Sequence, residues 1–184
     1  MKNLRRSIFV AFVILVISGA ALAFLPIPSI FNAPPENPPE VVKYVDLKRF
    51  SGLWYEIARF PNPYQEGCIN SRASYTVNPD GTVEVSNLCD VHGEEKSLTG
   101  SAVVEDPATN AKLKVTFLWP LTGDYWIVVL DRDYKYAVIS EPGREKLWIL
   151  AREKTLPERA YKDIIKKLTA NGYDTSRLIK TTHK

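Results

Sequence analysis

The chain has 184 residues, the size of a single domain with one hydrophobic core. Its formal net charge of +3 comes from Lys2, Arg5 and Arg6 at the N-terminus, and the remainder carries 21 basic and 21 acidic residues. A neutral domain lacks the concentrated basic surface that nucleic-acid binding needs. Two cysteines and two histidines are also too few for a usual zinc site. We therefore expect no nucleic-acid partner, no metal and no cofactor.

Residues 1–23 have the three parts of a secretory signal peptide. The three basic residues precede an unbroken apolar run over 8–17, and the A-L-A sequence at 21–23 matches an A-x-A cleavage site. The apolar character continues to Leu25, and about 18 such residues are the lower limit for spanning a bilayer, so an uncleaved membrane anchor is the alternative. In both cases the sequence predicts export from the cytoplasm.

Residues 24–40 are predicted to be a Pro-rich linker, followed by a folded domain over 41–184. The linker contains six prolines: Pro26, Pro28, Pro34, Pro35, Pro38 and Pro39. Such a density of proline favours extended polyproline II backbone, which forms a semi-rigid spacer and no packed core.

Hydrophobic periodicity changes to two residues from Leu53 onward. It predicts eight strands, over 53–60, 69–78, 82–89, 97–104, 111–118, 125–130, 134–140 and 146–152. The turns between them are short, which favours antiparallel pairing of consecutive strands. Eight strands in this order can close into an up-and-down barrel without exposed sheet edges. The predicted fold class is therefore all-β, an eight-stranded antiparallel up-and-down barrel.

A single helix is predicted after the last strand, in the segment LPERAYKDIIKKLTANG over 156–172. Pro157 suits a first turn, apolar residues recur at helical spacing as far as Leu168, and Gly172 is typical of a C-terminal stop. The strands at 125–130 and 134–140 are apolar on both faces. We therefore expect the helix to pack on the outside of the barrel over these strands.

Alternation also assigns one face of each strand to the barrel interior. On the fourth strand Leu98, Gly100, Ala102 and Val104 share that face, and two of them have almost no bulk. Small inward residues leave volume for a ligand in a barrel of eight strands. The alternative is that they only ease strand curvature and the interior is packed with side chains. The pattern leaves both interpretations open.

Cys68 and Cys89 are expected to form a disulfide, because this is the default for two cysteines in an exported protein. They lie at the far ends of the hairpin predicted over 69–89. If Val77 pairs with Val83, Ser71 faces Cys89 and Cys68 lies three residues further out. A bulge or a flexible segment is then needed to bring the two sulfur atoms together.

Three motifs, in this order, resemble the lipocalin family and most closely its bacterial lipocalin and apolipoprotein D branch. They are G-x-W-Y at Gly52, Trp54 and Tyr55, a D-Y turn at Asp133 and Tyr134 that continues with Tyr136 and Ala137, and Arg152 at the end of the last strand. The resemblance covers residues 41–180. It implies a barrel open at one end, the calyx, in which Trp54 plugs the closed end and Arg152 lies across it. Gly52, Trp54 and Arg152 are therefore expected to be structural residues.

The resemblance further implies binding, storage or transport of a small hydrophobic ligand in the cell envelope: a fatty acid, phospholipid or lysophospholipid. The inward faces supply the predicted wall of the site: Tyr75, Val83, Val85, Leu98, Ala102, Val115, Phe117, Tyr125, Ile127 and Trp148. Ordinary barrel core is the alternative for each of them.

Two other functions are alternatives to the binding and transport of a ligand. A lipocalin-fold enzyme acting on a lipid is disfavoured, because there is no G-x-S-x-G motif and His92 and His183 lie in a charged loop and at the C-terminus. An interaction module is the other alternative, because FLWPLTGDYW over 117–126 places aromatic residues around one loop. That loop could contact a membrane or a partner protein, or could be the rim of the calyx.

Many bacterial members of the family are lipoproteins, with a cysteine directly after the signal peptide. This chain has no cysteine before Cys68. We therefore expect a periplasmic or secreted protein, or one anchored through its N-terminal segment, that is not a lipoprotein.

Overall fold

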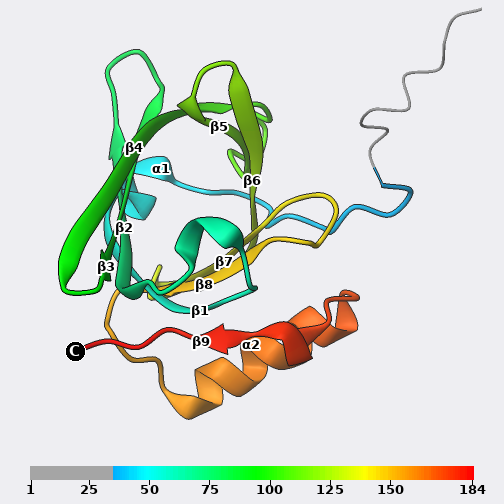
Figure 1. Cartoon of the computed structure of the whole chain (residues 1–184). Helices are drawn as coiled ribbons and strands as arrows, with labels where there is room; N and C mark the ends of the chain where they lie inside the picture. The colour runs from blue at the N-terminus through cyan, green and yellow to red at the C-terminus, as the bar shows by residue number, and fades with distance from the viewer. Residues whose placement is uncertain (1–34) are drawn as a thin grey trace, which may run out of the picture. The chain divides into compact units, whose positions relative to one another are not determined.

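The computed structural model describes residues 35–184 (Figure 1). The predicted signal peptide at 1–23 and most of the predicted linker at 24–40 lie outside the described residues. Eight strands follow one another along the chain: β1 (Gly52–Arg59), β2 (Ile69–Val77), β3 (Val83–Val91), β4 (Glu94–Val104), β5 (Lys112–Leu118), β6 (Leu121–Leu130), β7 (Tyr136–Ser140) and β8 (Leu147–Ala151).

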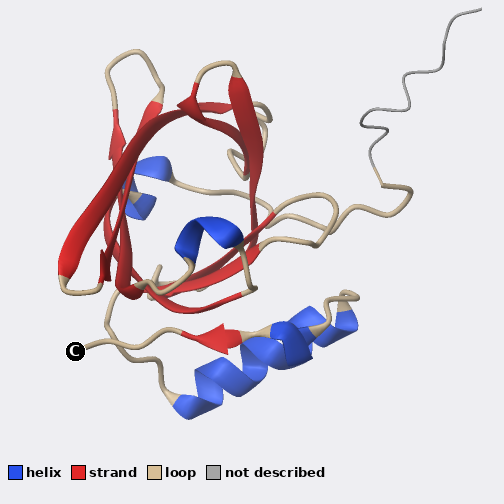
Figure 2. Cartoon of the chain, viewed as in Figure 1, coloured by secondary structure: helices blue, strands red, loops and turns tan. Residues whose placement is uncertain are grey.

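Consecutive strands pair in antiparallel fashion from β1 to β8, and β1 also pairs with β8. This last ladder closes the sheet into a barrel, seen nearly end-on in Figure 2. The predicted eight-stranded up-and-down barrel is confirmed, with strand bounds that differ from the prediction by a few residues. The largest difference is at β6, which begins at Leu121 rather than Tyr125 and forms a hairpin with β5.

The predicted helix is α2 (Glu158–Ala170), and it packs on the outside of the barrel (Figure 1). Ile164 and Leu168 on α2 are 1% exposed and belong to an apolar cluster with Val138 and Ile149 from β7 and β8. The apolar outer faces of these strands are thus explained by the helix that covers them. No helix among residues 35–184 is long and apolar enough to cross a bilayer.

Four short elements were not predicted: α1 (Leu47–Phe50), η1 (Pro63–Gln65), η2 (Thr175–Arg177) and β9 (Ile179–Lys180). Each has two to four residues, too few for a hydrophobic period to show. Two of them contribute to the barrel. The segment with α1 covers one end of it, and η1 belongs to the loop over 60–68 that leads from β1 to β2.

The C-terminal segment completes the wall where β1 and β2 separate. These strands pair only over Gly52–Tyr55, and β9 pairs with the end of β1 instead. The backbone N–H of Thr181 donates to the carbonyl of Ile57 at 3.0 Å, and Asn70 N–H donates to the carbonyl of Thr182 at 2.8 Å. The segment therefore bridges the opening between β1 and β2.

The Cys68–Cys89 disulfide is present, and a bulge brings its ends together as the sequence required. Val77 pairs with Val83, and the register shifts between Ile69 and Arg72, so that Ile69 pairs with Asp90. Within the bulge Asn70 has a φ of 53°, a left-handed conformation that Asn tolerates better than most residues. The disulfide links residues 21 apart in the sequence and fixes the outer end of the β2–β3 hairpin.

Gly100 does not leave an empty space in the barrel. This bears on the interpretation that the small residues on β4 leave volume for a ligand. A Cβ at this position would lie 2.5 Å from the carbonyl oxygen of Thr116 and 2.6 Å from Cδ1 of Phe117. Gly100 therefore permits the close approach of β5 and its Phe117 ring. The expectation that its small size creates ligand volume is wrong at this position.

Candidate functional site

One end of the barrel is closed by Trp54 and Arg152. Trp54 is fully buried, its indole N–H donates to the carbonyl of Phe50 at 2.7 Å, and the Arg152 guanidinium lies 3.9 Å from its ring centroid. Arg152 also donates to the carbonyls of Leu53, Arg49 and Phe50. This arrangement holds α1 against the start of β1.

Gly52, the first residue of the G-x-W-Y motif, has a positive φ beside this closure. Its φ of +92° lies in a region that side chains rarely allow, and a Cβ there would approach Nη1 of Arg152 to 3.5 Å. The conformation of Gly52 thus fits the turn into β1 next to the guanidinium.

The half of the interior next to the closed end is densely packed. Tyr125 donates its hydroxyl hydrogen bond to the Tyr75 hydroxyl at 2.7 Å across the barrel. The remaining cavity is about 10 Å³, room for one water molecule at most. Its lining comprises Leu47, Phe50, Tyr75, Val83, Val85, Ala102, Leu113, Tyr125 and Ile127. The structure thus brings six of the ten predicted wall residues together around this cavity, and Val115 is buried in the same core.

Both tyrosines have raised pKa values, because burial disfavours the phenolate. The pKa of Tyr75 is about 12, and that of Tyr125 lies well above its ordinary value. Both phenols therefore stay neutral at any physiological pH, and their hydroxyl pair is a polar feature without charge.

Alkaline pH is expected to unfold the protein through these two phenols. Above about pH 10 the unfolded chain loses phenolic protons that the folded chain keeps, so the free energy of unfolding falls by up to about 2.7 kcal/mol per pH unit for two groups. Urea unfolding at pH 8, 10 and 11 measures this slope, and Y75F/Y125F is expected to reduce it. The exposed pair Y44F/Y64F serves as control. A slope that is unchanged in Y75F/Y125F would contradict the assignment.

The inner face of the other half is less completely buried. Leu98 on the inner face of β4 is 51% exposed, and Phe117 and Trp148 are partly exposed. The β4–β5 ladder begins only at Ser101, so β4 has no β5 partner beside Leu98. Leu98 is therefore more exposed than the other predicted wall residues.

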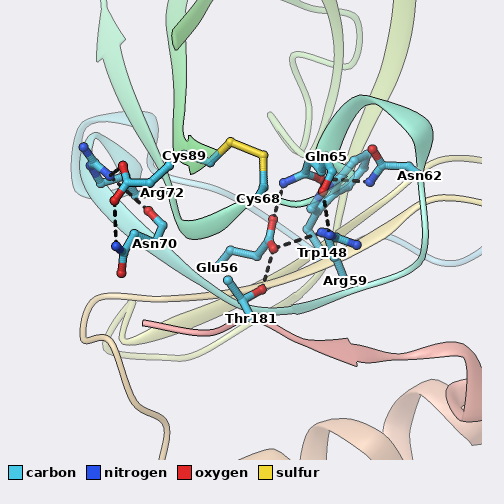
Figure 3. The surroundings of a disulfide bond; sticks show 11 residues. Glu56, Arg59, Asn62, Gln65, Cys68, Asn70, Arg72, Cys89, Trp148 and Thr181 are labelled. Atoms are coloured by element: carbon cyan, nitrogen blue, oxygen red, sulfur yellow. Dashed lines mark hydrogen bonds and ion pairs between the residues drawn. A yellow bond between two sulfur atoms is a disulfide. The ribbon is translucent and has the colours of Figure 1, made fainter. Parts of the chain in front are cut away.

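A polar cluster lies in this region, next to the disulfide (Figure 3). Glu56 is 3% exposed and Arg59 is 8% exposed. Glu56 forms an ion pair with Nε of Arg59 at 3.3 Å, accepts from Gln65 Nε2 at 2.6 Å, and accepts from the Thr181 hydroxyl. Gln65 in turn accepts the indole N–H of Trp148 at 2.8 Å. The cluster therefore joins β1, the loop over 60–68, β8 and the C-terminal segment.

Glu56, Arg59 and Gln65 are not among the site residues predicted from the sequence. A register shift in β1 between Glu56 and Ala58 breaks the alternation, so that Glu56 and Arg59 point to one cluster although three residues apart. The one available signal was the placement of two charged residues in an otherwise apolar strand, YEIARF.

Exposed apolar side chains mark the rim of the open end. Leu118, Trp119 and Leu121, at the tip of the β5–β6 hairpin, are 69%, 85% and 69% exposed, and the Trp119–Pro120 peptide bond is cis. Tyr64 in η1 is 85% exposed. We call these four residues the apolar rim. The aromatic loop of the sequence therefore does lie at the mouth of the barrel.

The family model of the lipocalin-like domain matches residues 45–183. The temperature-induced lipocalin-1 of Arabidopsis thaliana is 44% identical over 151 residues, which span 77% of this chain and 81% of that protein. The outer membrane lipoprotein Blc of Escherichia coli K12 is 34% identical over 165 residues, 89% of this chain and 93% of that protein.

The Blc relatives overturn one prediction made from the sequence. Four such relatives, from two Escherichia coli strains, Citrobacter freundii and Vibrio cholerae, are outer membrane lipoproteins and 34–37% identical to this chain. The expectation that the protein is not a lipoprotein is contradicted by them. It rested only on an absence, the lack of a cysteine before Cys68.

Solved structures show the same architecture. Insecticyanin from the tobacco hornworm Manduca sexta superposes with a TM-score of 0.67 at 22% identity, covering 83% of this chain and 87% of that one. Lobster apocrustacyanin A1 has a TM-score of 0.60 at 19% identity, covering 80% and 91%. The barrel, the motif residues at its closed end and the family match over most of the chain agree: this chain belongs to the lipocalin family.

Proposed function

We propose that this protein binds, stores or transports a small hydrophobic molecule in the cell envelope, of the class of fatty acids, phospholipids and lysophospholipids. The observation that carries the proposal is the contrast between the two halves of the barrel. One half is closed by Trp54 and packed, and the other has partly exposed inner residues, Phe117 and Trp148, facing solvent. A site that is concave, mostly apolar and fitted with a few polar groups is typical of ligand binding.

The packing of the closed half supports a ligand position in the open half. A cavity of about 10 Å³ is no larger than one water molecule needs, so an acyl chain lies above the hydroxyl pair of Tyr75 and Tyr125. The predicted wall residues on this side are Leu98, Phe117 and Trp148. The others form the packed floor beneath the ligand.

The apolar rim supports contact with a membrane as part of this function. Trp119 and Leu121 stand exposed at the tip of a hairpin, where an apolar side chain gains free energy by entering a bilayer. Their place beside the open end would let a lipid pass directly between bilayer and barrel. Flotation of the protein with lipid vesicles would support this contact, and protein that stays unbound would contradict it.

A binding protein fits the cluster better than an enzyme does. Both carboxylate oxygens of Glu56 are engaged by partners, and Cys68 and Cys89 are joined. His92 lies exposed at the turn between β3 and β4. Glu56 and the two cysteines therefore do not supply the free base or nucleophile that hydrolysis of a lipid ester needs.

Native mass spectrometry of the purified full chain, followed by organic extraction, tests the proposal. We expect one lipid per chain, and stoichiometric binding of a fluorescent fatty acid by the delipidated protein without its conversion. A protein that is empty after purification and also fails to bind the fluorescent fatty acid would overturn the proposal. Turnover of lipid esters that is lost in E56Q would favour the enzyme instead.

A further inference from the structure

The carboxylate of Glu56 is occupied by hydrogen bonds and an ion pair with other residues of the protein. It receives the Arg59 Nε, the Gln65 amide and the Thr181 hydroxyl, from three different segments of the chain. Figure 3 shows these side chains converging beside the Cys68–Cys89 disulfide. Glu56 therefore orients its three partners and has little capacity left for a ligand.

The guanidinium of Arg59, unlike the Glu56 carboxylate, is not fully engaged by other residues. Its Nε faces Glu56, and its Nη2 donates to the carbonyl of Gln65 at 2.8 Å. Among residues 35–184, its Nη1 has no hydrogen-bond acceptor. The side chain is 10% exposed, so its free N–H groups have little access to water. A guanidinium has five N–H donors, and Nη1 is not among the buried side-chain atoms without a partner, so its N–H groups keep some contact with solvent.

A second polar group in the same part of the barrel also has no partner. Ser71 is 2% exposed, and its Oγ makes no hydrogen bond among the described residues. Its neighbours Asn70 and Arg72 both line a groove on the outer surface, so Ser71 faces the interior. The β1–β2 ladder ends at Tyr55 and Arg72, so Ser71 is not paired with Glu56 and is not part of the Arg59 site.

We propose that Arg59 binds the oxyanion of an acidic amphiphile, the carboxylate of a fatty acid or the phosphate of a lysophospholipid. This inference rests on the proposed function and specifies how its ligand is oriented. The acid group lies under the loop over 60–68, and the acyl chain lies along Phe117 and Leu98 toward the apolar rim.

The chemistry favours an oxyanion over a neutral head group. Arg59 and Glu56 together are neutral, so the selectivity comes from directed N–H groups in a poorly solvated place and not from net charge. Hydrogen bonds from a guanidinium to an oxyanion are about twice as strong as neutral ones. With Glu56 sharing the cation, we expect a preference of about tenfold, since tenfold corresponds to about 1.4 kcal/mol.

The test compares two ligands that differ only in the head group, oleic acid and oleyl alcohol, at pH 8 and below their aggregation concentrations. The delipidated full chain is expected to bind oleic acid about tenfold more tightly. In R59M the affinity for oleic acid is expected to fall to that for oleyl alcohol, while oleyl alcohol binds as before. R159M, which removes an exposed arginine on α2, is the matched control and is expected to keep the preference.

Each outcome separates this inference from the proposed function. If the wild-type chain binds neither ligand, the proposed function fails. If it binds both equally, or if R59M keeps the preference, only the head-group inference fails. Should R59M not fold, E56Q/R59M removes both charges, and its loss of the preference gives the same answer. Displacement of oleic acid by inorganic phosphate alone would overturn the assignment to a lipid head group.

Discussion

Replacing Trp54 with alanine is expected to lower the free energy of unfolding by about 3–5 kcal/mol, the usual cost of removing a large aromatic residue from a core. Trp54 is completely buried, and its ring is in contact with Phe50 at 4.8 Å between centroids. The change also removes the ring under Arg152, whose guanidinium lies 3.9 Å from it, and the hydrogen bond to the carbonyl of Phe50. The closed end would thus lose its packing and one of its polar contacts together.

Denaturant unfolding of W54A and W119A measures this effect against a matched control. Trp119 is 85% exposed, so W119A removes the same side chain from a site where almost nothing packs on it. Its effect on stability is expected within about 0.5 kcal/mol. Equal stabilities of the two variants would show that Trp54 does not hold the closed end, and that α1 and Arg152 close it by themselves.

The barrel could be predicted from the sequence because its strands repeat a short physical pattern many times. Along β2, β3 and β5 apolar residues alternate with polar ones, and burial follows that alternation at Tyr75, Val85 and Leu113. The apolar outer faces of β6 and β7 likewise predicted the position of α2. These features are local, so the sequence of a single strand is enough to predict which of its faces is buried.

The parts that could not be predicted depend on contacts between distant segments. Gly100 looked like a source of volume, but the approach of Phe117 from β5 fills that place. Arg59 turns inward because of a register shift in β1, and Gln65 reaches Glu56 only because the loop over 60–68 folds back. No periodicity within one segment reports such contacts. The apolar residues around the small cavity could therefore be predicted from the sequence, and the polar cluster could not.

Glu56→Ala is the second change with a large expected effect, about 3–5 kcal/mol of lost stability, because it leaves a buried cation without its partner. Arg59 keeps only 10% of its side-chain surface exposed, so water cannot replace the carboxylate. The same change removes the acceptor of the Gln65 amide and of the Thr181 hydroxyl. The loop over 60–68 and the C-terminal segment thus lose a common attachment point.

Thermal and denaturant unfolding of E56A is compared with that of E95A. Glu95 pairs with Arg72 on the outside of the barrel with 54% of its side chain exposed, and exposed pairs contribute about 0–1 kcal/mol. A loss in E56A as small as that in E95A would mean that Arg59 finds another acceptor or solvent. It would also remove the reason to regard its N–H groups as poorly solvated.

The neutral double variant E56Q/R59M separates stability from function. Buried ion pairs often contribute no more than uncharged residues of similar size, because the cost of desolvating two charges offsets their attraction. We expect E56Q/R59M to recover most of the stability lost in E56A, since the amide oxygen introduced by E56Q can still accept from Thr181 or Gln65. If it does so and binds oleic acid no better than oleyl alcohol, the charge pair is not needed for the fold, and its effect lies in the choice of the ligand's head group.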